Sequence, residues 1–248
     1  MTSKAQDHQG YIKTCPQLVL PVAVQPHQFY EFATEAAAEL QVQYAPHLRL
    51  AGTVLGGLLD DLPASFDLIN ESPLAGIMIA ALLGVTTQYP EAAAYLRSRL
   101  RPETASEFLN VTDMNSLDAV AHFGMRDIYA FFIGGKADLQ APILRKVLNI
   151  EMKLGYHGVP AMPLFIYKAI GDQYCPIQFT DSLVDKFGGV GADITYERNK
   201  AGGHVAEIEN GKQRALDWLW TIFKETYVPS DSGCIIRDVE VRVSSLST

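Results

Sequence analysis

Apolar residues recur along the chain at helical spacing in some segments and at strand spacing in others. Glu31 to Tyr44 is rich in Ala, Glu and Leu and indicates a helix that ends before Pro46. The apolar run Leu48 to Leu55 then leads into Gly56, as a buried strand entering a loop does. A helix followed directly by a strand is typical of an α/β sheet. We expect the buried face of the helix to be apolar and to comprise Phe32, Ala33, Ala36, Ala37 and Leu40.

The second half of the chain repeats this alternation. Two apolar runs, Pro163 to Ala169 and Asp193 to Asn199, indicate strands separated by a helix-like segment. Glu207 to Lys224 indicates an amphipathic helix that packs back on the sheet, and Ile235 to Val243 indicates an edge strand or ordered coil. We expect the apolar side of the last helix to comprise Leu216, Leu219, Trp220 and Phe223.

The section from about Ser65 to His157 does not alternate strands with helices. Four segments are helix-like and are separated by Pro, Asn and Gly, which favours a helical cap or lid inserted into an α/β core. The alternative is a run of ordinary crossover helices, although one crossover needs only about a dozen residues or slightly more. The four segments are Leu74 to Leu83, Pro90 to Leu100, Leu117 to Phe123 and Pro142 to Met152.

Composition excludes several function classes. The 248 residues are 48% hydrophobic and 19% charged, enough for a sizeable core. A formal charge of −8 argues against a nucleic-acid or anionic-membrane surface. Three scattered cysteines and the spacing of the histidines give no disulfide framework and no metal site, so we expect no metal and no cofactor. The short run Leu18 to Val24 is broken by Pro21, so we expect no signal peptide, and no run is long enough for a transmembrane segment.

Asp172 and His204 follow the two predicted strands of the second half. Loops at the carboxyl ends of parallel strands carry the chemistry of open α/β sheets. There an aspartate can orient a histidine, which then accepts a proton from a nucleophile. Each residue also has a structural alternative, because Asp172 suits a helix N-cap or turn and His204 suits a surface loop. Neither alternative is eliminated by the sequence.

No nucleophile accompanies this pair in the sequence. The pattern Gly-Xaa-Ser-Xaa-Gly, which exposes a serine on a strained turn between strand and helix, does not occur. Cys175 precedes Pro176 and Cys234 lies in the C-terminal tail, so neither cysteine has an equivalent setting.

Four segments together resemble the secretory lipase family of fungi. They are EAAAELQVQYAPHLRLAGTVLGG from Glu35, PLAGIMIAALLGVTTQYPE from Pro73, HGVPAMPLFIYKAIGDQYCPI from His157, and the closing AGGH. The resemblance covers about Phe32 to Cys234. It implies an α/β-hydrolase with a helical cap that hydrolyses triacylglycerols and other esters, and that is secreted.

Position by position, the resemblance implies that Asp172 is the acid and His204 the base of a Ser-Asp-His triad. The family's serine elbow falls on Pro26 to Tyr30 when counted back without gaps, so Gln28 stands in the place of the nucleophile. The resemblance also implies a disulfide partner for Cys234 near Phe187, where the sequence has no cysteine.

These observations predict a truncated α/β-hydrolase domain over residues 27–227 with a cap at about 65–157. An unmatched leader, 1–26, precedes the domain, and a tail, 228–248, follows it. The leading hypothesis is an ester hydrolase of the lipase family that acts on a lipid or ester substrate, at a lipid–water interface if the substrate is a lipid. The alternative is a non-catalytic lipid-binding or regulatory protein that retains the lipase fold.

Overall fold

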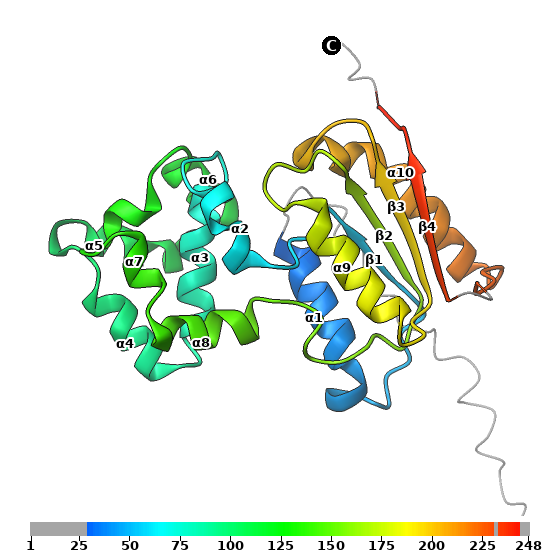
Figure 1. Cartoon of the computed structure of the whole chain (residues 1–248), viewed down its shortest axis with the longest axis horizontal. Coiled ribbons are helices and arrows are strands. Elements are labelled where there is room, and N and C mark those ends of the chain that lie inside the picture. Colours follow the sequence, from blue (N-terminus) through cyan, green and yellow to red (C-terminus); the bar gives the residue numbers. More distant parts are fainter. Residues whose placement is uncertain (1–28, 231–232, 244–248) are drawn as a thin grey trace, which may run out of the picture.

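The computed structural model describes residues 29–230 and 233–243. Within these residues the centre is a sheet of four parallel strands in the order β1-β2-β3-β4, with helices on both faces (Figure 1). The α/β class predicted from the sequence is therefore confirmed. The strands are β1 (Thr53–Gly56), β2 (Leu164–Ala169), β3 (Ile194–Asn199) and β4 (Cys234–Val239).

Both ends of the sheet refine the predicted strand limits. The apolar run from Leu48 was expected to be strand, but β1 begins only at Thr53, opposite Leu164. Strand β2 itself begins at Leu164, so the ladder between the two strands starts there, and Leu48 is 42% exposed. At the other end, β4 is the edge strand that one of the two alternatives predicted, and it pairs parallel to β3.

Helices α1 (Phe29–Tyr44) and α9 (Ile177–Gly188) pack on one face of the sheet. The helix predicted at the start is confirmed, but its buried face is only partly the expected one, with Phe32 and Ala36 half-buried against the core. Ala33 and Ala37 are exposed, whereas the buried positions comprise Glu31, Glu35, Ala38 and Glu39. Glu39 shows why a carboxylate is tolerated there, because it accepts backbone N–H bonds from Gly155 and His157 at 2.5 and 2.9 Å.

Helix α10 (His204–Phe223) covers the opposite face. Its packing on the sheet is confirmed, but two of the residues assigned to its apolar side are wrong, since Trp220 and Phe223 are each 57% exposed. The side chain that packs is Trp218, which stacks on Phe165 of β2 with ring centroids 5.7 Å apart. The buried residues of the helix include Ala215, Trp218, Leu219 and Ile222. They follow the helical period, but the buried face is rotated from the predicted one.

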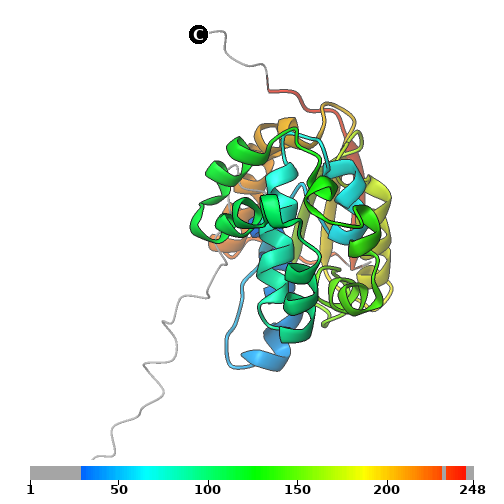
Figure 2. The same cartoon turned by 90° about the vertical axis from the view of Figure 1, so that its left-hand side faces the viewer.

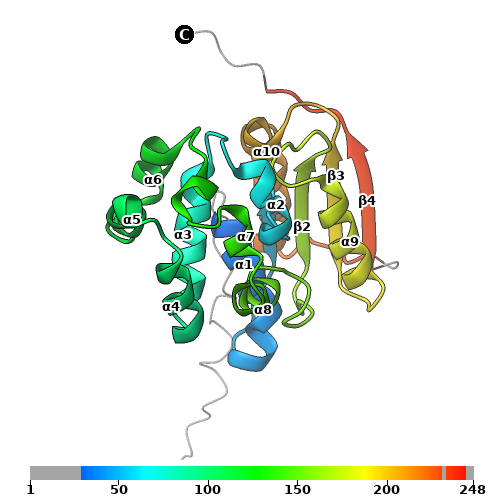
Figure 3. The same cartoon turned by 60° about the vertical axis from the view of Figure 1, so that its left-hand side comes forward.

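Between β1 and β2 the chain forms a helical block, residues 62–151, beside the sheet (Figure 1) and toward the viewer in Figure 2. All four predicted helices are present, and the block packs around a hydrophobic core of its own. Tyr174 and Cys175, from the loop after β2, join that core, so this loop lies where the block meets the sheet (Figure 3). The block comprises α2 (Leu62–Ile69), α3 (Ala75–Thr86), α4 (Pro90–Ser98), α5 (Pro102–Leu109), η3 (Asn110–Asp113), α6 (Ser116–Phe123), η4 (Ile128–Phe131), α7 (Lys136–Leu139) and α8 (Pro142–Glu151).

None of the helices in residues 29–230 and 233–243 is both long and apolar enough to cross a membrane. At the start of β4, Cys234 lies against Gly188, where a Cβ would meet the Cys234 Cβ at 3.1 Å. The residue that faces Cys234 at the end of α9 is thus a glycine. The sequence has no cysteine at the place near Phe187 that the resemblance implied.

Close packing between α10 and β2 gives a first prediction. A Cβ at Gly211 would lie 2.0 Å from Cδ2 of Tyr167, so Gly211→Ala forces the helix and strand apart. We expect the free energy of unfolding, measured with urea, to fall by about 1–3 kcal/mol. Gly84→Ala is the control, because nothing lies within 4 Å of that position in α3. It should raise stability by about 0.5–1 kcal/mol, and equal effects of the two substitutions would contradict this packing.

Candidate active site

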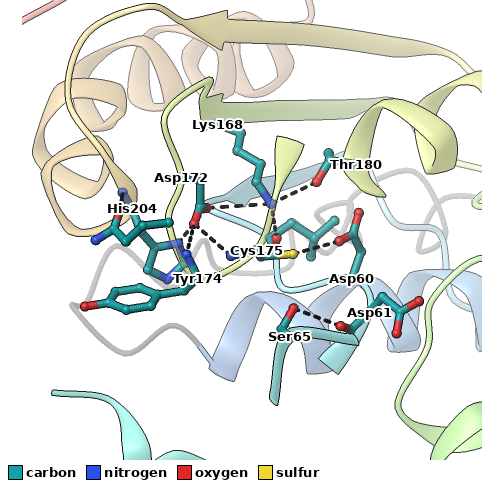
Figure 4. A network of polar contacts seen from close by, with 11 residues as sticks. Asp60, Asp61, Ser65, Lys168, Asp172, Tyr174, Cys175, Thr180 and His204 are labelled. Carbon is teal, nitrogen blue, oxygen red and sulfur yellow. Dashed lines mark hydrogen bonds and ion pairs between the residues drawn. The ribbon is translucent and has the colours of Figure 1, made fainter. Parts of the chain in front are cut away.

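Asp172 and His204 meet at the carboxyl end of the sheet. Asp172 follows β2 by three residues and His204 follows β3 by five, and the two strands are neighbours in register. The Nδ1 atom of His204 lies 2.7 Å from Oδ2 of Asp172, and both side chains are fully buried (Figure 4). The structure thus brings together the two residues that the sequence singled out.

Asp172 fills its structural role and its candidate chemical role at once. Its Oδ1 accepts the backbone N–H groups of Tyr174 and Cys175 at 3.0 and 2.9 Å, the turn that sequence reasoning offered as an alternative. Its Oδ2 remains for His204. Burial alone raises the pKa of Asp172, but the hydrogen bond from His204 and the nearby charge of Lys168 outweigh it and lower that pKa below its ordinary value. The turn therefore fixes an ionised carboxylate beside the imidazole.

The sequence suggested that His204 lies in a loop, but it is the first residue of α10. The two preceding glycines permit this entry. Gly202 has a φ of +82°, and a Cβ at Gly203 would lie 2.6 Å from Oε1 of Gln173. That same oxygen accepts the backbone N–H of His204 at 3.1 Å, so it satisfies a donor at the helix start.

The ring of His204 is held on its other sides as well. Tyr174 meets it edge-on, with centroids 5.3 Å apart and planes at 89°. Its Nε2 atom is buried and has no hydrogen-bond partner among the described residues. With Nδ1 donating to Asp172, Nε2 carries a lone pair that can accept a proton.

Beneath this pair lies a charged layer that sequence reasoning missed. Lys168 is fully buried in β2, and its Nζ lies 3.7 Å from Oδ2 of Asp172. The thiol of Cys175 donates to Oδ1 of Asp60 at 3.1 Å, and burial raises the pKa of that thiol to about 12. A lysine inside the otherwise apolar strand Leu164–Ala169 is the sequence signal that could have revealed this layer.

Two further carboxyls on α1 face the same interior. Glu31 is 7% exposed and Glu35 is fully buried, and neither oxygen of Glu35 has a hydrogen-bond partner among the described residues. Burial raises the pKa of each to about 8, and in Glu35 the charges of Glu39 and Asp60 raise it further. Both carboxyls are therefore neutral in the folded protein at mildly acidic pH.

None of the described groups is hydrogen-bonded to His204 Nε2, where a nucleophile would be expected. The Cys175 thiol is bonded to Asp60, away from His204, and Cys234 pairs with Ile194 at the opposite end of β3. Gln28, where the resemblance places the nucleophile, lies outside the described residues. No group of three His, Cys, Asp or Glu side chains within 29–230 and 233–243 could hold a metal ion.

A family model described as secretory lipase matches residues 29–229 of the chain. The chain belongs to the secretory lipase family. It is 55% identical over 212 residues to "Probable trichothecene esterase SAT6" of Stachybotrys chartarum, across 86% of this chain and 44% of that protein. It is 38% identical over 221 residues to "Trichothecene C-3 esterase" of Fusarium sporotrichioides, across 86% of this chain and 49% of that protein. The chain thus spans about half the length of the curated relatives it matches or slightly less.

A solved structure shows the same fold. Candida antarctica lipase A in its closed state superposes with a TM-score of 0.73 at 20% identity, covering 85% of this chain and 50% of that one. At this identity the likeness concerns the fold alone. The four parallel strands and their helices are thus part of an α/β-hydrolase fold, as expected for a secretory lipase.

The buried glutamates of α1 predict how stability depends on pH. Glu35 keeps its proton in the folded state up to about pH 8, whereas the unfolded chain releases it near its ordinary value of 4.5. The folded state therefore binds more protons between these values, and stability falls as pH rises. In Glu35→Gln we expect this fall to be shallower by about 1.4 kcal/mol per pH unit, measured by urea unfolding between about pH 5 and 8.

The control for this series is Glu91→Gln, which removes an exposed carboxylate of α4. Its stability curve should run parallel to that of the unsubstituted chain. If the curve of Glu35→Gln runs parallel as well, the buried position of Glu35 is not the cause of the pH dependence.

Proposed function

We propose that Asp172 and His204 serve the hydrolysis of a carboxylic ester through an acyl-enzyme. The observation that carries the proposal is the buried 2.7 Å contact between His204 Nδ1 and Asp172 Oδ2, with Nε2 left without a partner among the described residues. An imidazole fixed in this tautomer is the general base that a serine nucleophile requires. Membership of the secretory lipase family supports the same reaction class.

In the proposed reaction, which requires a serine where the resemblance places Gln28, Nε2 of His204 takes the serine proton as the serine oxygen attacks the ester carbonyl. Asp172 stabilises the imidazolium that forms, and backbone N–H groups hold the oxyanion. The bond to the alcohol then breaks, and His204 gives the proton to the departing alcohol oxygen. A water molecule, deprotonated by His204, releases the acid in a second round of the same steps.

For the substrate we propose a trichothecene ester in preference to a triacylglycerol. Both relatives compared above are named as trichothecene esterases. The helical block, residues 62–151, is the proposed cap over the substrate, because it meets the sheet at the loop that carries Asp172 and Tyr174.

The second candidate function is binding of an ester or lipid without hydrolysis. It is favoured by Gln28 in the position that the family gives to its serine, because a glutamine amide cannot form an acyl-enzyme. This candidate keeps the fold and the acid–base pair but predicts no turnover.

Turnover of an ester by the unsubstituted chain separates the two candidates, and a substitution at Gln28 tests whether the pair can assist a serine. We expect Gln28→Ser to hydrolyse p-nitrophenyl acetate about tenfold or more faster than the unsubstituted chain, since general base assistance by His204 contributes about 10²–10⁴. His204→Ala in the Gln28→Ser background should remove the gain. His122→Ala, which removes an exposed histidine of α6, is the control and should keep it.

The outcomes of this experiment differ for the two candidates. A gain that survives His204→Ala would contradict the proposed role of the pair. Absence of any gain, with saturable binding of a trichothecene ester to a folded chain, would favour the non-catalytic candidate. Faster hydrolysis of tributyrin than of a trichothecene C-3 ester by Gln28→Ser would contradict the substrate proposal.

A further inference from the structure

Lys168 is buried where a charged side chain is energetically unfavourable. It lies on the face of β2 that also carries Leu164 and Ile166, and no part of its side chain is exposed. A buried ammonium group is costly unless it is paired and hydrogen-bonded. Lys168 meets this condition, because its Nζ donates to the Leu58 carbonyl at 2.6 Å and to Thr180 Oγ1 at 3.0 Å (Figure 4).

The third neighbour of Nζ is the carboxylate that holds His204. Oδ2 of Asp172 lies 3.7 Å from Lys168 Nζ and 2.7 Å from His204 Nδ1, so a single carboxylate oxygen faces both the ammonium group and the imidazole. Lys168 is the one fully buried Lys or Arg in the part of the chain that the structure describes. The carboxylate thus has a permanent positive partner that does not depend on protonation of the histidine.

We propose that Lys168 is a positioning residue that, through Asp172, disfavours protonation of His204 and so keeps its Nε2 free to accept a proton. A proton on His204 would place a second positive charge on the same carboxylate, close to Lys168. Like charges at this separation in a buried site disfavour the imidazolium. The relevance to catalysis rests on the ester hydrolysis proposed above, but the effect on His204 does not.

The surrounding groups leave this arrangement intact. The His204 ring contacts Asp172 and Tyr174, while Glu207, one turn along α10, is bonded to Asn199 and Arg214. Lys168 is faced by Asp60 from the loop after β1, by Cys175 from the loop after β2, and by Glu31 from α1.

The protonation of Lys168 and of its neighbours fits the same arrangement. Burial alone lowers the pKa of Lys168, but Cys175, Asp60 and Asp172 together raise it above its ordinary value. Burial raises the pKa of Asp60 and of Glu31. Asp172 is therefore the neighbour that keeps its negative charge most readily as pH falls.

The proposal is tested by following the His204 imidazole by NMR as a function of pH. In Lys168→Met we expect the apparent pKa of the Asp172–His204 pair to rise by about one unit or more. The control is Lys146→Met, which removes an exposed lysine of α8 and should leave that pKa unchanged. An unchanged pKa in Lys168→Met would overturn the proposal.

A second measurement needs no substitution at the buried site and can still overturn the proposal if Lys168→Met does not fold. It reports the charge of the Lys168 amino group. The ¹⁵N shift of Lys168 Nζ in the unsubstituted chain should be that of a charged ammonium group at pH 7. A neutral amine at that pH would overturn the proposal. Neither measurement uses a substrate, so absence of ester hydrolysis does not contradict this inference. Conversely, an unchanged pKa in Lys168→Met does not contradict the proposed hydrolysis.

Discussion

The contact between the Asp172 carboxylate and the His204 imidazole is the constraint on which the site depends. The two residues are 32 positions apart in the chain and are joined by the register of two neighbouring parallel strands. Asp172 is fixed by two backbone N–H groups of its own turn, and His204 by its place at the start of α10. The sheet and the helix start therefore determine the 2.7 Å distance, rather than the flexibility of either side chain.

The interior around this contact contains more acids than bases. Glu31, Glu35 and Asp60 are all buried in this interior, and burial raises the pKa of each. Burial thus favours the neutral form of these carboxyls, whereas Asp172, whose Oδ2 lies 3.7 Å from Lys168 Nζ, has a lowered pKa.

Much of the fold could be predicted because strand and helix periods are local. The strands at Pro163 to Ala169 and Asp193 to Asn199 and the pairing of Asp172 with His204 follow from period and topology. The buried face of α1 could not be fully predicted, since one of its buried glutamates, Glu39, bonds to amides more than 100 residues away, those of Gly155 and His157. The choice of Trp218 over Trp220 likewise depends on the position of Phe165 across the sheet. The roles of Lys168 and Gln173 depend on groups from other elements and carry no local period.

Membership of the secretory lipase family indicates ester hydrolysis for this site. The proposed reaction in turn requires a particular protonation state of the His204 imidazole. The account requires a neutral imidazole that carries its proton on Nδ1 and none on Nε2. The most direct test is the ¹⁵N spectrum of the His204 ring at neutral pH. The account predicts a protonated Nδ1, bonded to Asp172, and an unprotonated Nε2. A protonated Nε2 at that pH would contradict it, because the base would then have no site for a serine proton.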